Sequence, residues 1–410
     1  MKFLRSQSGR LVLGAMVVGI GAALFLYGRF RPSPAAAAYE RGKILADAHL
    51  VEDAKAVYAE AIRLDPRFAP PYRALAEIAA AQGDQVAAID YWQAYLAHAI
   101  KPKHAWCRLA ECEFQIGKRA SARRDAAKEL QLDPDCGEAH LLAGLLSEHD
   151  ATPQAALYHL ERAARAFPDR LFVQFVYGRD LALGGQYDRA IQVLNGVVAR
   201  DPRHAGAHRW LGYAYAHLPS RPDSARQTED HLRRALESRP DYPEASYDLA
   251  RLYQGQHQAA RALPYARNAV RGRKHYPRAL YLLARLYKDL GRQEEAARAL
   301  KEFRRESDLA TRQEALRAQY KSDPANVETA LALSETLLAL EAPQAAVEIL
   351  RDAAGRAPGE ARLRAALSQA EALLAAGTAR NGSLARAQGI GSADPAELPE
   401  SVSGPSRERE

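Results

Sequence analysis

Three cysteines are the first residues to consider for metal or redox chemistry. No two of the cysteines have C-x-x-C spacing, since they lie at Cys107, Cys112 and Cys136. Structural zinc sites, iron–sulfur clusters and thiol oxidoreductases commonly depend on such a pair, because one turn of chain then presents two thiolates to the same atom. The spacing therefore disfavours all three kinds of site.

Other residue types offer no better starting point for catalysis. His204, His208 and His217 lie close together in the chain, but surface and packing roles are expected more often than a metal site for such a group. The sequence has no P-loop, G-x-S-x-G, H-E-x-x-H or dinucleotide fingerprint. We therefore expect no catalytic, cofactor-binding or metal-binding residues, no cofactor, and no enzymatic activity.

Helical periodicity is the dominant pattern of the chain. In the segment from Tyr281 to Phe303, apolar residues recur every three to four positions on both sides of a polar break. This pattern predicts two short amphipathic helices, with Gly291 in the left-handed conformation that ends the first. Such a hairpin cannot bury both apolar stripes alone, so it needs similar neighbours.

Similar hairpins recur along the chain, each with one small residue in either helix. A larger side chain there would force the paired backbones apart. The pairs are Gly42/Ala54, Ala76/Ala88, Ala110/Ala122, Gly144/Ala156, Gly178/Ala190, Ala250/Ala262, Ala284/Ala296 and Ser334/Ala346. Proline closes many units, and Pro134, Pro168 and Pro202 follow one another at intervals of 34 residues.

These features resemble the tetratricopeptide repeat family, whose period is about 34 residues. The best matches are "WLGYAY", "YGRDLALGGQYDRAIQVL", "YDLARLY" and "LLARLYKDLG", and the resemblance covers roughly residues 37–376. It implies an all-α, right-handed superhelical solenoid of about nine helix-turn-helix repeats with a C-terminal capping helix. The pattern departs from the family at "AHLPSRPDSARQTEDHL", where the loop between helices is longer, and at residues 304–323.

The repeat pattern sets the expected domain boundaries. Repeats are expected over residues 38–303, a polar helical connector over 304–323, and a final repeat with the capping helix over 324–376. Residues 377–410 are rich in Gly, Ser, Pro and charge without apolar periodicity, which predicts a disordered tail. We expect essentially no sheet.

The N-terminus has a different character. A basic tail (1–10) precedes an apolar segment (11–28) that is long enough to be a transmembrane signal-anchor helix, and a Pro/Ala spacer (29–37) follows it. A cleaved signal peptide is the alternative, since residues 36–38 offer an A-x-A site. Three basic residues precede the span and four follow it, so the positive-inside rule hardly distinguishes the two orientations of this segment in the membrane. The short N-terminal tail favours repeats outside the cytoplasm, which in a bacterium means the periplasm.

In the repeat register, Cys107 and Cys136 lie near the starts of neighbouring first helices. A disulfide between them is geometrically conceivable outside the cytoplasm, although buried free thiols are the favoured expectation.

A binding surface is the remaining candidate for function. The family resemblance implies that first helices line a concave groove, where basic and aromatic residues would alternate. Such a surface suits an extended acidic peptide or a C-terminal carboxylate. The alternative is solvated arginines beside packing tyrosines, and single-stranded nucleic acid is disfavoured because of the membrane segment. The candidate groove residues are Phe172, Phe175, Arg179, Arg209, Tyr213, Tyr247, Arg251, Arg278, Tyr281, Arg285 and Lys288.

These expectations describe a membrane-anchored, non-enzymatic scaffold that binds a protein or peptide partner in cell-envelope assembly or export. An accessory subunit that positions a catalytic partner, in polysaccharide or cytochrome maturation, is the alternative. A self-assembling structural protein is a third. The sequence does not define the oligomeric state.

Overall fold

The computed structural model describes residues 33–100, 102–147, 153–273 and 275–388. The expected N-terminal tail and membrane anchor, the first four residues of the spacer and the last part of the expected tail lie outside the described residues. Among the helices that the structure describes, none combines the length and apolar content needed to cross a bilayer. The chain divides into two compact units, Met1–Ala166 and Phe167–Glu410.

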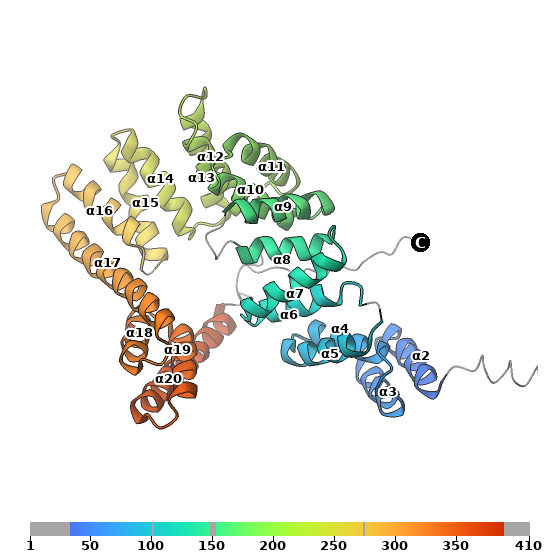
Figure 1. Ribbon diagram of the computed structural model, residues 1–410. Coiled ribbons are helices and arrows are strands. Elements are labelled where there is room, and N and C mark those ends of the chain that lie inside the picture. The colour runs from blue at the N-terminus through green and yellow to red at the C-terminus, as the bar shows by residue number, and fades with distance from the viewer. Residues whose placement is uncertain (1–32, 101, 148–152, 274, 389–410) are drawn as a thin grey trace, which may run out of the picture. The chain divides into compact units, whose positions relative to one another are not determined.

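Helices account for all the regular secondary structure of the described residues, and successive helices pack as pairs (Figure 1). The first unit contains α2 (Pro34–Asp47), α3 (Val51–Leu64), α4 (Pro70–Ala81), α5 (Gln85–His98), α6 (Ala105–Gln115), α7 (Arg119–Leu132), α8 (Gly137–Ser147) and α9 (Pro153–Ala166). The second contains α10 (Leu171–Leu183), α11 (Tyr187–Arg200), α12 (Ala205–Ala216), α13 (Ser224–Ser238), α14 (Pro243–Gly255), α15 (Ala259–Gly272), α16 (Pro277–Asp289), α17 (Gln293–Ser322), α18 (Val327–Ala339), α19 (Pro343–Arg356) and α20 (Ala361–Gln388). The predicted all-α array of helix pairs is confirmed.

The small residues of each pair lie where the two helices touch. A Cβ atom built on Gly178 would meet Leu194 Cδ2 of the partner helix at 2.7 Å, and one built on Gly144 would meet Leu160 Cδ2 at 2.7 Å. Both leucines are fully buried. The glycines therefore permit the close helix approach that the sequence pattern predicts.

The turns also follow from local sequence. Gly291 has φ +75°, the left-handed value expected at the end of a first helix. At the Asp-Pro boundaries the aspartate side chain forms a short turn: Asp201 Oδ1 accepts a hydrogen bond from the Arg203 N–H at 3.1 Å. These contacts satisfy polar groups where one repeat ends and the next begins.

Two C-terminal boundaries differ from the expected ones. Residues 304–323 are not a separate connector, because α17 runs without a break from Gln293 to Ser322. No Gly or Pro interrupts that segment, so the second helix of a pair continues until Pro324. Its end then packs on the last pair, where the Tyr320 hydroxyl donates to Asp352 Oδ2 at 2.6 Å.

The last helix, α20, also extends further than expected. It caps the last pair, with Leu363 and Ala370 buried, as predicted for a capping helix. However, it continues to Gln388, whereas the sequence predicts a disordered tail from residue 377. Residues 377–388 include Gly377 and Gly382 but no proline, and seven of the twelve are Ala, Leu, Arg or Gln, which favour a helix; the prolines of the tail begin at Pro395.

Two repeats contain the same pair of histidines between their helices. His140 Nδ1 lies 2.9 Å from His159 Nδ1, and His208 Nδ1 lies 3.0 Å from His231 Nδ1. In the second pair, His208 Nε2 lies 3.0 Å from the carbonyl oxygen of Pro202, which can only accept a hydrogen bond. His208 is therefore protonated at Nε2 and accepts at Nδ1, so His231 donates from Nδ1.

Burial favours the neutral state of three of these histidines, His159, His208 and His231. Burial, together with a smaller effect of the neighbouring His208, lowers the pKa of His231 to about 4. Burial also lowers the pKa values of His208 and His159. Protonation of His208 at Nδ1 would place its N–H group against the Nδ1–H of His231. The hydrogen bond between these two histidines therefore requires both to remain uncharged.

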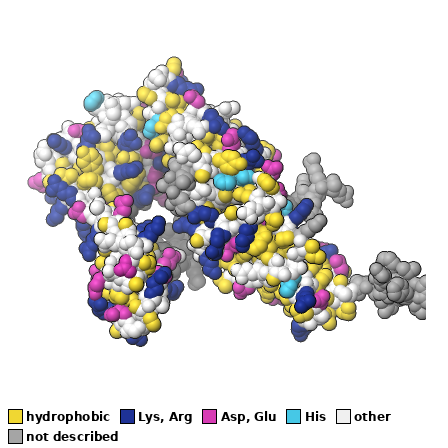
Figure 2. Space-filling model, viewed as in Figure 1, with side chains coloured by type: hydrophobic (Ala, Val, Ile, Leu, Met, Phe, Trp, Pro, Cys, Tyr) yellow, Lys and Arg dark blue, Asp and Glu magenta, His cyan; other side chains and the backbone are white. Residues whose placement is uncertain are grey.

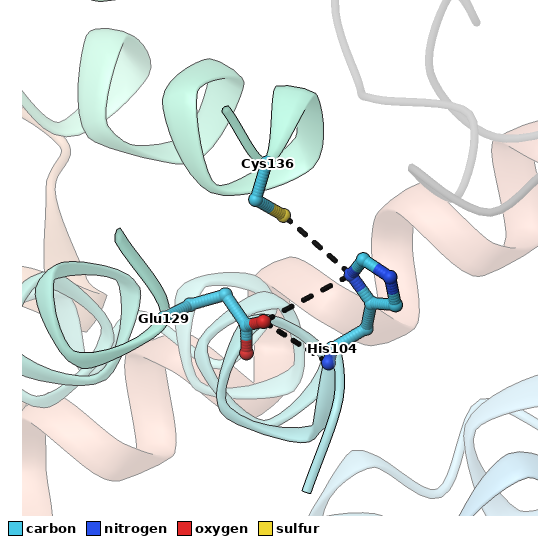
Figure 3. A group of neighbouring side chains, drawn as sticks. All are labelled: His104, Glu129 and Cys136. Atoms are coloured by element: carbon cyan, nitrogen blue, oxygen red, sulfur yellow. Dashed lines mark hydrogen bonds and ion pairs between the residues drawn. The ribbon is translucent and has the colours of Figure 1, made fainter. Parts of the chain in front are cut away.

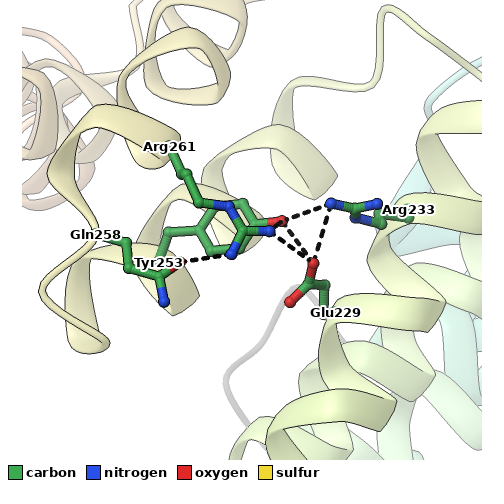
Figure 4. A network of polar contacts seen from close by, with 5 residues as sticks. All are labelled: Glu229, Arg233, Tyr253, Gln258 and Arg261. Carbon is green, nitrogen blue, oxygen red and sulfur yellow. Dashed lines mark hydrogen bonds and ion pairs between the residues drawn. The ribbon is translucent and has the colours of Figure 1, made fainter.

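A polar network joins α13, α14 and α15 (Figure 4). The hydroxyl of Tyr253, a buried residue, donates to Glu229 Oε1 at 2.8 Å. Arg233 and Arg261 each donate to the same hydroxyl, at 3.2 and 3.1 Å, and each lies 3.1 Å from Glu229 Oε1. The network fixes the relative positions of these three helices, of which α13 and α14 line the cavity described below.

Candidate partner-binding face

First helices form one row in the second unit. Helix α12 touches both α10 and α14, and α14 touches α16, so first helices of neighbouring repeats contact one another directly. Among the described residues, no comparable contact joins α11 to α13 or α13 to α15. The first helices therefore lie on the inner side of this unit, which is where the candidate residues were placed from sequence.

The candidates on α10 are used for packing. Phe175 is buried, and the centroid of its ring lies 4.6 Å from that of His204 on the next repeat. Arg179 Nε donates to Asp180 Oδ1 at 2.9 Å, and Phe172 is half-buried. These three residues contribute little surface or charge for a partner.

Arg209 of α12 is also committed to an internal contact. Its Nε donates to Asp248 Oδ2 on α14 at 3.0 Å, and its guanidinium lies 4.5 Å from the centroid of the Trp210 ring. Burial raises the pKa of Asp248, and the charge of Arg209 acts against that increase. Arg209 thus joins two repeats and neutralises a buried carboxylate.

A cavity of about 460 Å³ lies next to this ion pair. It is formed by α12, the following loop, α13 and α14, and its polar lining includes Tyr213, Asp248 and Arg251. Thr228 also lines it, and the hydroxyl oxygen of this residue is buried without a hydrogen-bond partner. The structure therefore brings two predicted residues, Tyr213 and Arg251, to one cavity.

The charges around the cavity leave a net positive site. Asp248 is balanced by Arg209, whereas Arg251 has no ion-pair partner among the described residues. The Arg251 guanidinium carbon instead lies 5.9 Å from the centroid of the predicted Tyr247 ring. One guanidinium, an unpartnered hydroxyl and aromatic walls suit a single carboxylate.

Sequence reasoning missed the part of the cavity that the longer loop provides. Helix α12 ends at Ala216 and α13 begins only at Ser224, so His217 and Pro219 of the loop reach the lining. The available signal was the departure from the repeat pattern at "AHLPSRPDSARQTEDHL". That departure predicts a longer loop, and extra residues between two packed helices also create space beside them.

The candidates on α16 form an exposed strip. Arg278, Tyr281, Arg285 and Lys288 occupy neighbouring positions of one helix face, and all four are exposed. The centroid of the Tyr281 ring lies 5.2 Å from that of Phe303, and 47% of Tyr281 is exposed. None of the three cations has an ion-pair partner within the described part of the chain. Figure 2 shows Lys and Arg side chains among hydrophobic ones over α16 and α17, at the left of the view.

Comparison with known proteins identifies the repeats. The tetratricopeptide repeat family matches residues 107–170, 178–243 and 247–311. Together these segments cover slightly less than half of the chain, and they are similar to tetratricopeptide repeats. Such repeats are generally non-catalytic scaffolds that bind protein or peptide partners.

Solved structures give further similarities to the helical-repeat fold. PilF of Pseudomonas aeruginosa is 20% identical, with 50% of this chain and 90% of that chain covered and a TM-score of 0.42. The type IV pilus biogenesis factor PilW is 18% identical over 58% of this chain and 100% of that chain, with a TM-score of 0.43. YrrB, a tetratricopeptide repeat protein with an unusual peptide-binding site, is 22% identical over 46% and 95%, with a TM-score of 0.41. No curated protein matches the chain.

Proposed function

We propose that this protein is a membrane-anchored scaffold that holds an acidic segment of a partner protein on α14 and α16. The observation that carries the proposal is that the arginines of the first helices differ in their ion pairing. Arg209 is paired with a buried carboxylate, whereas Arg251 and Arg285 carry no ion pair among the described residues. The uncompensated charge is therefore concentrated on α14 and α16.

The chemistry of this surface favours carboxylates presented on an extended segment. A guanidinium binds a carboxylate through two parallel N–H···O bonds, and the neighbouring tyrosines offer flat surfaces for the rest of the segment. Arg251 borders the cavity, where one acidic side chain or a C-terminal carboxylate can be enclosed. Arg278, Arg285 and Lys288 then contact acidic residues further along the same segment.

The membrane segment proposed for residues 11–28 would supply a second contribution. An anchored scaffold meets membrane-associated partners at a raised effective concentration, so modest affinity per contact suffices. We place the repeats on the extracytoplasmic side, in keeping with the short N-terminal tail. A role in envelope assembly or export follows from that location.

The test is capture of partners by full-length protein crosslinked in its own membrane. The variant carries Arg251→Glu and Arg285→Glu. The matched control carries Arg271→Glu and Arg298→Glu, which make the same charge change at exposed positions of the second helices α15 and α17. We expect the first variant to lose a partner that the wild type and the control retain, with helix content unchanged. Equal loss in both variants would indicate a nonspecific charge effect and would refute the proposal, as would full retention in both.

A further inference from the structure

Three donor groups converge in the first unit at the junction of two repeats (Figure 3). His104 immediately precedes α6, Glu129 comes from α7, and Cys136 immediately precedes α8. One ligand atom from each lies within 4.8 Å of the others. Cys107, in the first turn of α6, is buried in the same cluster as Cys136.

The separations match the edges of a metal tetrahedron. Metal–ligand distances of about 2.3 Å for sulfur and about 2.0–2.1 Å for nitrogen or oxygen imply ligand–ligand separations of roughly 3.3–3.6 Å. Cys136 Sγ lies 3.7 Å from His104 Nδ1, and His104 Nδ1 lies 3.9 Å from Glu129 Oε1. These two separations exceed a tetrahedral edge by a few tenths of an ångström, and the remaining pair of ligand atoms lies within 4.8 Å.

The fold holds the carboxylate in position without using all of its acceptor capacity. Glu129 Oε1 accepts from the backbone N–H of His104 at 3.0 Å, and Oε2 accepts from that of Cys107 at 3.3 Å. A carboxylate has about four lone-pair sites, so Oε1 retains one for an ion. These outer contacts fix the ligand in the way that supporting hydrogen bonds do in metal sites.

The surroundings favour a cation that can enter from solvent. A second carboxylate, Glu138 Oε2, lies 3.9 Å from Cys136 Sγ, so the cluster carries negative charge. Both cysteines are buried, whereas 56% of the His104 side chain is exposed. The imidazole can therefore swing aside for an ion and return as the outermost ligand.

We propose that His104, Glu129, Cys136 and Cys107 form a tetrahedral Zn²⁺ site. This site joins the repeat formed by α6 and α7 to the repeat formed by α8 and α9. Mixed nitrogen, oxygen and sulfur donors in four-coordinate geometry are the ligand set that zinc prefers. The site is made by packing of three helices rather than by closely spaced cysteines, which is why the sequence does not indicate it. Its occupation would stabilise the contact between the two repeats by linkage.

The test is titration of the reduced full-length protein with Co²⁺ and then Zn²⁺. We expect one equivalent of Co²⁺ to give the visible bands of a tetrahedral ion and a thiolate-to-cobalt charge-transfer band, both removed by one equivalent of Zn²⁺. Cys136→Ser should abolish the spectrum, and Cys107→Ser should reduce the charge-transfer band to about half. Cys112→Ser is the matched control, because Cys112 is buried on the same helix α6 but packs in another cluster; it should leave the spectrum intact.

His104→Gly separates metal binding from folding. His104 has φ +57°, a conformation that glycine adopts without strain, so the metal-free variant should be at least as stable as the metal-free wild type. Its Zn²⁺ affinity should fall by about 100-fold or more, since even loss of an outer hydrogen-bond partner costs roughly 10–100-fold. Absence of a tetrahedral spectrum in the wild type, or an unchanged spectrum in Cys136→Ser, Cys107→Ser or His104→Gly, would overturn the proposed four-ligand site.

Discussion

Acidification from pH 7 to pH 5 should destabilise the α12–α13 pair through His231. This histidine is neutral in the folded protein, where its pKa is lowered from 6.5 to about 4 by burial and by His208. Unfolding exposes the imidazole to water, so the unfolded chain binds a proton near pH 6.5. The associated stability is therefore present above pH 6.5 and is lost as pH falls toward 4.

The magnitude follows from the two pKa values. A difference of about 2.5 units corresponds to roughly 3 kcal/mol when the pH is below both. Between pH 7 and pH 5 a single group with these values loses about 2 kcal/mol, which is a factor of roughly 20–30 in the local opening equilibrium. The lowered pKa of His208 acts in the same direction.

Hydrogen exchange of the α12 and α13 amides measures this effect locally, so it does not require two-state unfolding of the whole repeat array. After correction for the intrinsic pH dependence of exchange, protection should fall by about 20-fold or more between pH 7 and pH 5. His231→Phe preserves the stacking on Tyr215 and should weaken this pH dependence, whereas His98→Phe, at an exposed histidine, should preserve it. Equal protection at both pH values in the wild type would refute the neutral-pair interpretation.

Three further substitutions test the packing that positions the site. Gly178→Leu should destabilise the α10–α11 pair by about 1–3 kcal/mol, because its side chain would collide with Leu194; urea unfolding followed by circular dichroism measures this. Arg209→Ala should cost about 3–5 kcal/mol by leaving Asp248 buried and unpaired, and thermal unfolding should show a smaller loss when both residues are replaced by leucine. Tyr253→Phe should cost about 1 kcal/mol, because it removes a hydroxyl that bonds a carboxylate and two guanidiniums; an unchanged denaturation midpoint would contradict the role assigned to this network.

The helix pairing could be predicted from sequence because its physical requirement is local and repeated. Gly178 and Leu194 must fit together in one repeat, and Gly144 and Leu160 must do so in another. Requirements that recur at fixed spacing appear as a pattern in a single sequence. The division of the repeats into paired helices was therefore predictable.

The helix boundaries near the C-terminus were not predictable to the same degree. The pattern marks where a repeat should end, but chain between repeats remains helical when no Gly or Pro interrupts it. Helix α17 shows this, since residues 304–322 lack both residue types and continue the helix. The prediction of a disordered tail used the composition of residues 377–410 as a whole. The prolines of that segment lie only beyond residue 388, so residues 377–388 could still form a helix.

The sequence predicts which helices carry the candidate site, but it does not predict which of the arginines there form ion pairs within the protein. The repeat register places Arg209 and Arg285 on first helices alike, yet only Arg209 has a carboxylate partner, and that partner is 39 residues away in the chain. Whether an arginine is paired depends on side chains from the next repeat. For the same reason, the proximity of His104, Glu129 and Cys136 has no spacing motif that could have indicated it.

Site-specific photo-crosslinking from Tyr281 tests the central claim most directly. A photoreactive residue at this exposed position of α16 should crosslink a partner, and mass spectrometry should identify the attached peptide as an acidic segment. The same residue placed at Arg271 on α15 should give no such product. Crosslinking that is equal from both positions, or that occurs only from Arg271, would contradict the assignment of α14 and α16 as the binding surface.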